Sequence, residues 1–372
     1  MKVPYFRYDF LYNEFKVDVD RALQSVLNRG AFIMQDELKD FEQAIADFTG
    51  AKYAIGVGNG TDSLILMLKA CGIGRGDEVI MASHTFVATA TAASWLGAIP
   101  VLVDCGDDHL MDVGKVEAAI TPKTKVIMPT QLNGRTCEMD RLQMIADKYH
   151  LVILEDAAQA LGSKYLNRCA GTWGKAGSIS FYPAKVLGCF GDGGIVLTDD
   201  PTIYQAILCM RDHGRNPKTN QVCMWGVNSR LDNVQAAVLL AKFKHYPQTM
   251  QRRREIAQRY CDKLTSIPEI TLPPAPKANT KHFDIYQNFE IEAENRDALR
   301  DFLKEHDIGT IIQWGGCALH QIKALAKDMH FDTSHLSRTE LLFKRCFMLP
   351  LNTSITDDEV DYICETISRF YR

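Results

Sequence analysis

Short apolar runs alternate with longer amphipathic segments from residue 52 onward. The runs are rich in β-branched residues and are bounded by Gly, Pro or Asp, which is typical of buried strands rather than helices. They lie at 52–58, 77–83, 99–105, 124–130 and 151–157. Each interval leaves room for one crossover helix, so the pattern predicts a mainly parallel sheet with helices on both faces.

Two more strand-like runs follow, "SISFY" (178–182) and "GGIVLTDD" (193–200), and they bring the expected sheet to seven strands. The alternation of short apolar runs with amphipathic segments ends near residue 246. We therefore expect a large α/β domain over 1–245, and we expect the N-terminal segment, about 1–25, to pack on the other domain.

A smaller α+β domain is expected over 246–372. It begins with a long charged helix over 248–264 and continues with a proline-rich loop over 272–280 and a strand over 283–293. The Thr-x-x-Glu pattern at 356–359 predicts a capping box that starts the last helix.

Composition excludes several classes of protein. The chain has 372 residues, of which 46% are apolar and 24% charged, and its net charge of -4 gives no general attraction to nucleic acid or anionic membranes. No segment approaches the roughly 18 apolar residues of a membrane span, so a cytoplasmic location is expected. The 11 cysteines are scattered, without a C-x-x-C pair, which favours reduced thiols and no metal site.

The stretch "GVGNGTDSL" (56–64) lies between a predicted strand and a predicted helix. Free backbone N–H groups at a helix start, with the hydroxyl of Thr61 beside Gly60, suit a phosphate. An ordinary capped helix is an equally good interpretation of this stretch alone.

Asp156 closes the strand over 151–157, and Gln159 follows it. A strand-end aspartate is often only a helix cap, but it also suits a cationic ligand atom. Lys185 stands 29 residues after Asp156, before the glycine cluster at 191–194. Most lysines are surface charges. A desolvated lysine, by contrast, loses proton affinity and becomes an amine nucleophile or base.

Together these residues provide a phosphate site, a carboxylate and an amine at one sheet edge. Pyridoxal phosphate (PLP) requires this combination, because the carboxylate keeps the pyridine nitrogen protonated and the amine forms a Schiff base. Phe86 is a candidate for stacking on the ring, although a core position would explain it equally well.

With these residues in place, the chain resembles the DegT/DnrJ/EryC1/StrS family of nucleotide-sugar aminotransferases, which have the fold-type-I α/β architecture. The resemblance covers nearly the whole length, in "GNGTDSL", "GDEVIMASHTFVATA", "EDAAQALGS", "SFYPAKVLGCFGDGG", "RDHGR" and "NSRLDNVQAA". It implies roles for the following residues: Lys185 as Schiff-base lysine and proton carrier, Asp156 at the pyridinium nitrogen, Gln159 at the phenolic oxygen, Gly60, Thr61 and Ser180 at the phosphate, and Phe86 over the ring.

The resemblance also implies a homodimer in which Asn228 reaches the phosphate of the partner subunit. Tyr182, Arg230 and His320 are candidate substrate contacts, although Arg230 could equally form a structural ion pair and His320 could be structural. Many relatives have a His-Tyr-Pro segment where this chain has Gln313 and Trp314, so a role of that histidine does not carry over.

The function implied is transfer of an amino group from L-glutamate to a nucleotide-linked keto-deoxysugar, for amino-sugar and surface-polysaccharide (O-antigen) biosynthesis. The stretch "GCFGDGG" and Tyr182 favour amination at C3 over C4 of the sugar. The nucleotide (dTDP, GDP or UDP) stays open. The alternatives are an aminotransferase acting on a cyclitol or aminobenzoate precursor, and a non-catalytic PLP-binding sensor or scaffold.

Overall fold

The central sheet of the computed structural model, which describes residues 1–276, 281–325 and 333–372, contains seven strands within that part of the chain. Their order across the sheet is β1 (Tyr53–Val57), β9 (Gly194–Thr198), β8 (Ala176–Ser180), β5 (Val152–Asp156), β4 (Thr124–Met128), β2 (Glu78–Ala82) and β3 (Ile99–Val103). Only β9 is antiparallel to its neighbours, β1 and β8. The predicted, mainly parallel sheet is confirmed.

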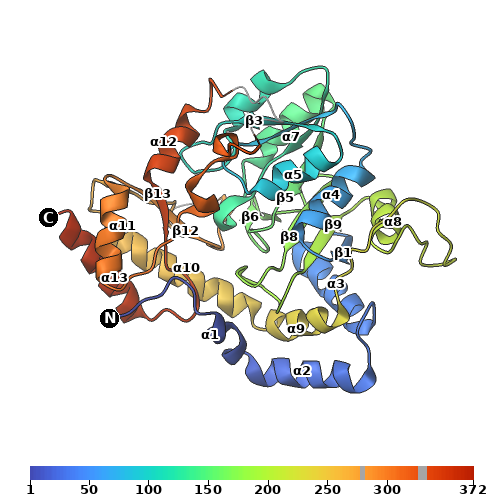
Figure 1. Ribbon diagram of the computed structural model, residues 1–372, viewed down its shortest axis with the longest axis horizontal. Coiled ribbons are helices and arrows are strands. Elements are labelled where there is room, and N and C mark those ends of the chain that lie inside the picture. The colour runs from blue at the N-terminus through green and yellow to red at the C-terminus, as the bar shows by residue number, and fades with distance from the viewer. Residues whose placement is uncertain (277–280, 326–332) are drawn as a thin grey trace.

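Helices cover both faces of this sheet (Figure 1). They are α3 (Asp36–Thr49), α4 (Gly60–Ala70), α5 (Val87–Trp95), α6 (Val113–Val116), α7 (Met139–Tyr149), α8 (Pro201–Met210) and α9 (Asn233–Phe243). Helix α2 (Lys16–Arg29) packs on α9. Strand alternation divides the core: Val79 and Met81 of β2 join the cluster under α4, α5 and α8, whereas Ile80 joins the cluster under α7. Both faces are therefore buried, which explains the continuous apolar runs.

The smaller part of the molecule is built on an antiparallel sheet of β10 (Ile270–Thr271), β12 (Phe289–Ala293) and β13 (Cys346–Leu349). Its helices are α10 (Tyr246–Leu264), α11 (Arg296–Glu305), α12 (Ser337–Arg345) and α13 (Asp357–Phe370). The predicted charged helix is α10, and the predicted capping box forms between Thr356 and Glu359 at the start of α13. None of the helices in the described ranges is long and apolar enough to cross a membrane.

The strand expected over 283–293 is shorter than predicted. Only β12 and the two-residue β11 (His282–Phe283) are extended, because Tyr286 between them adopts a left-handed backbone with φ 52°. β11 instead pairs with β6 (Lys164–Tyr165), which pairs with β7 (Arg168–Cys169) in a small third sheet. Of the expected proline-rich loop over 272–280, residues 277–280 lie outside the described part of the chain.

The N-terminal segment divides between the two parts of the molecule. Val3 forms a bridge with Ile308 and packs in the core of the smaller part, and α1 (Tyr8–Asn13) follows it. α2 lies along α9 instead, because its buried Val19 contacts the apolar face of α9. The expected packing of the whole segment on the smaller part is therefore wrong for residues 16–25.

Candidate active site

The loop between β1 and α4 leads into a helix start whose free N–H groups are suited to an anion. Asn59 caps α4, because its Oδ1 accepts a hydrogen bond from the backbone N–H of Asp62 at 2.8 Å. The N–H groups of Gly60 and Thr61 have no acceptor inside the helix, as in the first turn of any helix. Ser180, at the end of β8, lies beside them: a Cβ on Gly60 would be 3.2 Å from Ser180 Oγ. The structure thus brings Gly60, Thr61 and Ser180 together.

Two glycines that follow Lys185, Gly188 and Gly194, are required by close backbone packing. A Cβ on Gly194 would lie 2.4 Å from the carbonyl oxygen of Asn59, so this glycine lets β9 approach the start of α4. A Cβ on Gly188 would lie 2.6 Å from the carbonyl oxygen of Pro183, which holds the turn around Lys185.

Asp156 ends β5 as a buried carboxylate that is 4% exposed. Its oxygens accept hydrogen bonds from Thr89 Oγ1 at 2.7 Å and from the N–H of Ala158 at 3.2 Å. Burial raises the pKa of Asp156, and these hydrogen bonds and the charge of Lys185 oppose that rise. A buried carboxylate in this state is well suited to a cationic partner such as a pyridinium N–H.

Lys185 lies in the turn after β8, where its backbone N–H donates to the carbonyl oxygen of Tyr182 at 2.8 Å. Burial lowers the pKa of its amine to about 8, and the Asp156 carboxylate opposes this shift. The turn is also tied to the smaller part, since Gln287 bonds the N–H of Val186 and the carbonyl of Ala184. The lysine is therefore a half-buried amine with a lowered pKa, rather than a surface charge.

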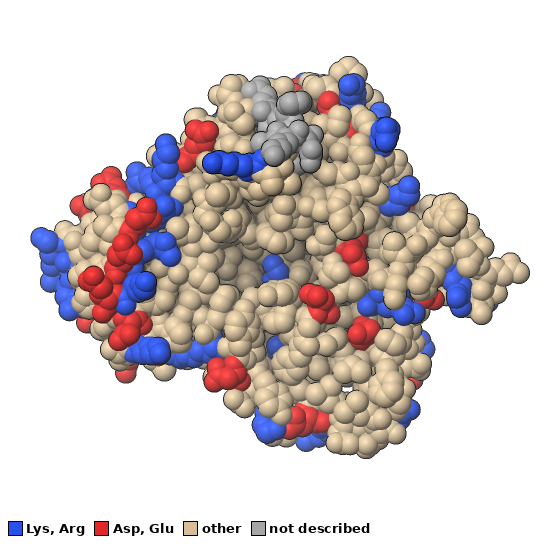
Figure 2. Space-filling model, in the orientation of Figure 1, with Lys and Arg blue, Asp and Glu red and all other residues tan. Residues whose placement is uncertain are grey.

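A cavity of about 270 Å³ opens at Lys185, between the two parts of the molecule. Tyr182 and Gln159 line it together with Gln313 and Trp314. Phe86, which is half exposed at the start of α5, packs against Trp314 with ring centroids 5.2 Å apart. Figure 2 shows that this face of the molecule is hollowed near its centre, where few charged side chains lie.

Of the expected residues, Gln159, Tyr182 and Lys185 line this cavity, whereas Asn228, Arg230 and His320 have neighbours elsewhere in the chain. Asn228 is exposed, and its backbone forms an isolated β-bridge with that of Asp212. The side chain of Arg230 forms an ion pair with the Asp212 carboxylate at 3.1 Å. His320 is buried, 3.8 Å from the Glu340 carboxylate, and burial lowers its pKa. Within one chain, Arg230 therefore forms the structural ion pair that was its alternative interpretation.

Sequence reasoning missed the hydroxyl groups behind Asp156. Thr89 donates to Asp156, Thr85 bonds Thr89 at 2.8 Å, and Thr130 bonds Thr85 at 2.7 Å. The threonine-rich "SHTFVATATA" was a visible signal, but its partner in β5 is distant in the sequence. Glu155, adjacent to Asp156, instead accepts backbone N–H groups of Gly171, Trp173 and Gly174, so it is structural.

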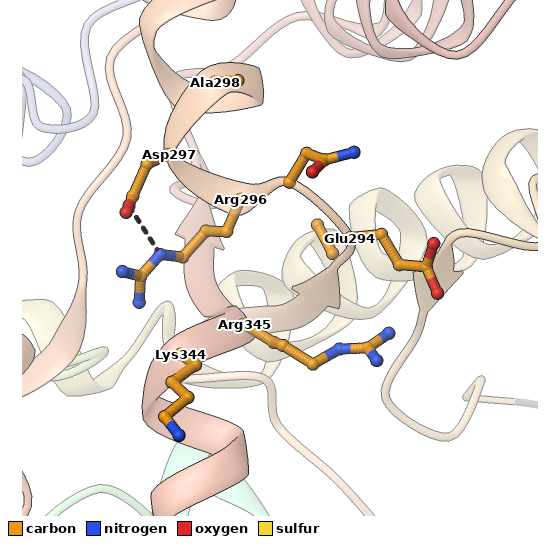
Figure 3. A pocket seen from close by; sticks show the side chains of 8 residues that line it. Glu294, Arg296, Asp297, Ala298, Lys344 and Arg345 are labelled. Atoms are coloured by element: carbon orange, nitrogen blue, oxygen red, sulfur yellow. Dashed lines mark hydrogen bonds and ion pairs between the residues drawn. The ribbon is translucent and has the colours of Figure 1, made fainter.

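A second hollow lies on the smaller part, away from Lys185, between the start of α11 and the end of α12 (Figure 3). Its cations already have acidic neighbours, since Arg296 pairs with Asp297 at 2.8 Å and Arg345 lies 3.9 Å from Glu292. None of the expected site residues lines it.

The groups around Lys185 fit PLP because the chemistry of each one matches a part of the cofactor. Helix α4 offers N–H groups to a phosphate, Asp156 offers a buried carboxylate to a pyridinium, and Lys185 offers an amine to an aldehyde. This site on a mainly parallel sheet with helices on both faces defines a fold-type-I aminotransferase. The cofactor would supply an electron sink for the bonds at the substrate carbon.

Comparison with known proteins agrees with this class. The chain belongs to the DegT/DnrJ/EryC1/StrS aminotransferase family, whose model matches residues 14–368. It is 38% identical over 352 residues to the dTDP-3-amino-3,4,6-trideoxy-alpha-D-glucose transaminase of Streptomyces venezuelae, covering 94% of this chain and 91% of the relative. It is also 36% identical, over 100% of this chain and 99% of the relative, to the "Pleiotropic regulatory protein" of Geobacillus stearothermophilus.

Solved structures show the same fold. The chain superposes on DesV of S. venezuelae with a TM-score of 0.95 and 35% identity, covering 100% of this chain and 99% of that one. It superposes on NtdA of Bacillus subtilis, which holds the cofactor PMP, with a TM-score of 0.91 and 30% identity, covering 99% and 85% of the two chains. The protein is an aminotransferase, and its cofactor is PLP.

Proposed function

We propose that this aminotransferase moves an amino group from L-glutamate to a keto sugar carried by a nucleoside diphosphate, and that it acts at C3 of the sugar. The single observation that carries the proposal is the half-buried Lys185 amine. The charge of Asp156 raises the pKa of this amine against the larger, opposite effect of burial, and the lysine lines the same cavity as Gln159 and Tyr182. That cavity opens between the two parts of the chain, and in this proposal the substrate enters there.

The names of relatives support the nucleotide sugar and the C3 position. Besides the S. venezuelae transaminase, relatives at 35–36% identity are named for a dTDP-3-amino-3,6-dideoxy sugar, for UDP-2-acetamido-2-deoxy-3-oxo-D-glucuronate and for UDP-N-acetyl-3-dehydro-glucosamine. All of these names place the amino or oxo group at C3, although they differ in the nucleotide.

The residues take the following roles in this proposal. Gly60, Thr61 and Ser180 bind the cofactor phosphate, Asp156 holds the pyridinium, Phe86 covers the ring and Gln159 faces the phenolic oxygen. Lys185 would carry a proton between the substrate and cofactor carbons, because burial lowers the pKa of its amine to about 8 and so leaves an appreciable neutral fraction near neutral pH. Tyr182 contacts the sugar from the cavity wall.

The protein acts as a homodimer with composite sites in this proposal. Asn228 follows an exposed apolar stretch in which Trp225 is 97% exposed and Val222 is 68% exposed. Exposed apolar side chains of this kind mark a surface that a partner covers. A second copy placed there would bring Asn228 to the partner subunit's phosphate site.

The composite site is tested by subunit mixing. The Lys185→Ala and Asn228→Ala proteins should each be weakly active at most. Random reassociation of their subunits gives hybrid dimers, in which one site contains both substitutions and the other site contains neither. Activity of the mixture should exceed that of either protein alone and approach about a quarter of the wild-type value. If mixing restores nothing, the two residues act in the same site.

The reaction itself is tested in two half-reactions followed by absorbance. Adding L-glutamate to the PLP enzyme should shift its colour, and adding 3-keto and 4-keto nucleotide sugars with dTDP, UDP or GDP should restore it for the true acceptor. Lys185→Ala should reduce turnover by at least about a thousandfold. Restoration of the colour only by a cyclitol ketone, or wild-type turnover in Lys185→Ala, would contradict the proposal.

A further inference from the structure

Asn133 occupies a turn between the two parts of the molecule. It lies in the short 3₁₀ turn Leu132–Gly134 that follows β4, and its backbone is left-handed with φ 56°. The carbonyl of Gly134 accepts the N–H of Ile285 at 2.9 Å, and a Cβ on Gly134 would be 2.6 Å from the backbone N of Gln287. The turn is therefore held against the segment before β12.

Every polar group of the Asn133 side chain is used, and so is its backbone N–H. The N–H donates to Gln159 Oε1 at 2.8 Å, and Nδ2 donates to Glu290 Oε2 at 3.0 Å. Oδ1 accepts from Asn288 Nδ2 at 2.9 Å and from Gln313 Nε2 at 2.6 Å. Asn133 thus joins Gln159, which lines the Lys185 cavity, through its backbone N–H to three residues of the smaller part, through its side chain.

The direction of these hydrogen bonds is fixed by groups that have only one role. A backbone N–H can only donate, so the carbonyl oxygen of Gln159 faces Asn133 and its NH₂ group is left for the opposite side. A carboxylate can only accept, so Glu290 fixes the NH₂ end of Asn133. Burial alone would raise the pKa of Glu290, but His84, the His109 ring at 2.8 Å and Asn133 lower it overall.

We propose that Asn133 is a positioning residue that turns the NH₂ group of Gln159 toward the phenolic oxygen of PLP, and that Glu290 of the smaller part keeps it there. This inference rests on the position of Gln159 in the proposed function. A donor at that oxygen favours its anionic form, so it lowers the pH at which the visible absorbance of the bound cofactor changes. Glu290, which does not line the Lys185 cavity, thereby affects the bound cofactor through Asn133 and Gln159.

The test is a pH titration of visible absorbance on purified PLP enzyme without substrates. Gln159→Met removes the donor and should raise the midpoint by about one pH unit. Asn133→Gly keeps the left-handed backbone and its N–H but loses three side-chain hydrogen bonds, and it should raise the midpoint by about half a unit. Glu290→Gln should move it in the same direction, because an amide no longer imposes one orientation on Asn133.

Asn167→Gly is the matched control, because Asn167 is exposed and also left-handed, with φ 64°. The midpoint of the absorbance titration of Asn167→Gly should equal that of the wild type. A midpoint that moves in Gln159→Met but in neither Asn133→Gly nor Glu290→Gln would overturn the inference and leave Gln159 in place. An unmoved midpoint in Gln159→Met would overturn the placement of Gln159 and the inference with it, whereas the half-reactions test the aminotransfer separately.

Discussion

At the scale of single residues, the buried Asp156 carboxylate depends on the neighbours that oppose the rise in its pKa caused by burial. Its carboxylate has one cation nearby, Lys185, and two neutral donors, Thr89 and Ala158. Hydrogen bonds to a buried charge are worth more than those between neutral groups. We therefore expect Thr89 to act on the cofactor through Asp156, as a positioning residue.

We expect Thr89→Val to lower kcat roughly tenfold, because the loss of its hydrogen bond raises the pKa of Asp156 and weakens its pairing with the pyridinium. Thr91→Val is the control: Thr91 is on the same helix, but it bonds only the carbonyl of Val87, at 2.9 Å. Steady-state turnover with the accepted substrates measures both. Equal kcat values for the two variants would show that Thr89 has no such role.

At the scale of elements, the phosphate site depends on how closely α4 approaches β9. The first turn of α4 is placed by Gly194, whose missing Cβ leaves room for the carbonyl of Asn59. The same helix start is tied on its other side by Ser229, whose Oγ donates to Asp62 at 2.6 Å and accepts from the N–H of Gly58 at 3.0 Å. Contacts on both sides thus set the direction of its free N–H groups.

Gly194→Ala should therefore displace this helix start. We expect unfolding in urea to require about 1–3 kcal/mol less free energy and the affinity for PLP to fall about tenfold. Gly74→Ala is the matched control, because a Cβ on Gly74 would meet no atom within 4 Å. A cofactor affinity that is unchanged in Gly194→Ala would mean that the helix start does not bind the phosphate.

At the scale of the whole molecule, buried ionic contacts join the sheet domain to β12. His109, after β3, bonds Glu290 at 2.8 Å and Glu292 at 3.1 Å. Burial opposes protonation of His109, but these two carboxylates raise its pKa to about 9. Glu292, which also pairs with Arg338, has a pKa lowered to about 2 despite its burial. The two parts are thus held together by a protonated imidazole.

This contact predicts a pH dependence of stability. The folded pKa of His109 lies above its unfolded value of about 6.5, so its contribution is complete below pH ~6.5 and is lost as the pH rises through about 9. The difference in unfolding free energy between wild type and His109→Gln should shrink over this window, by at most about 1.4 kcal/mol per pH unit.

His150→Gln provides the control. The backbone of His150 is left-handed (φ 54°), as is that of His109 (φ 66°), but the side chain of His150 is exposed. Chemical denaturation of the holoenzyme at several pH values measures both differences. A pH-independent difference for His109→Gln would show that this imidazole is not charged in the folded protein.

The sequence by itself determined the sheet, the long α10, the capping box and the positions of Asp156, Gln159 and Lys185 after their strands. These features follow from local periodicity and from the rule that parallel strands end at one edge. Only the tertiary structure decided which side chains hold them. Thr89 bonds Asp156, 67 positions away along the chain, and Asn133 bonds Gln159 and Glu290, which are 26 and 157 positions away. Such pairs exist only once the sheet has brought distant segments together, so no local pattern encodes them.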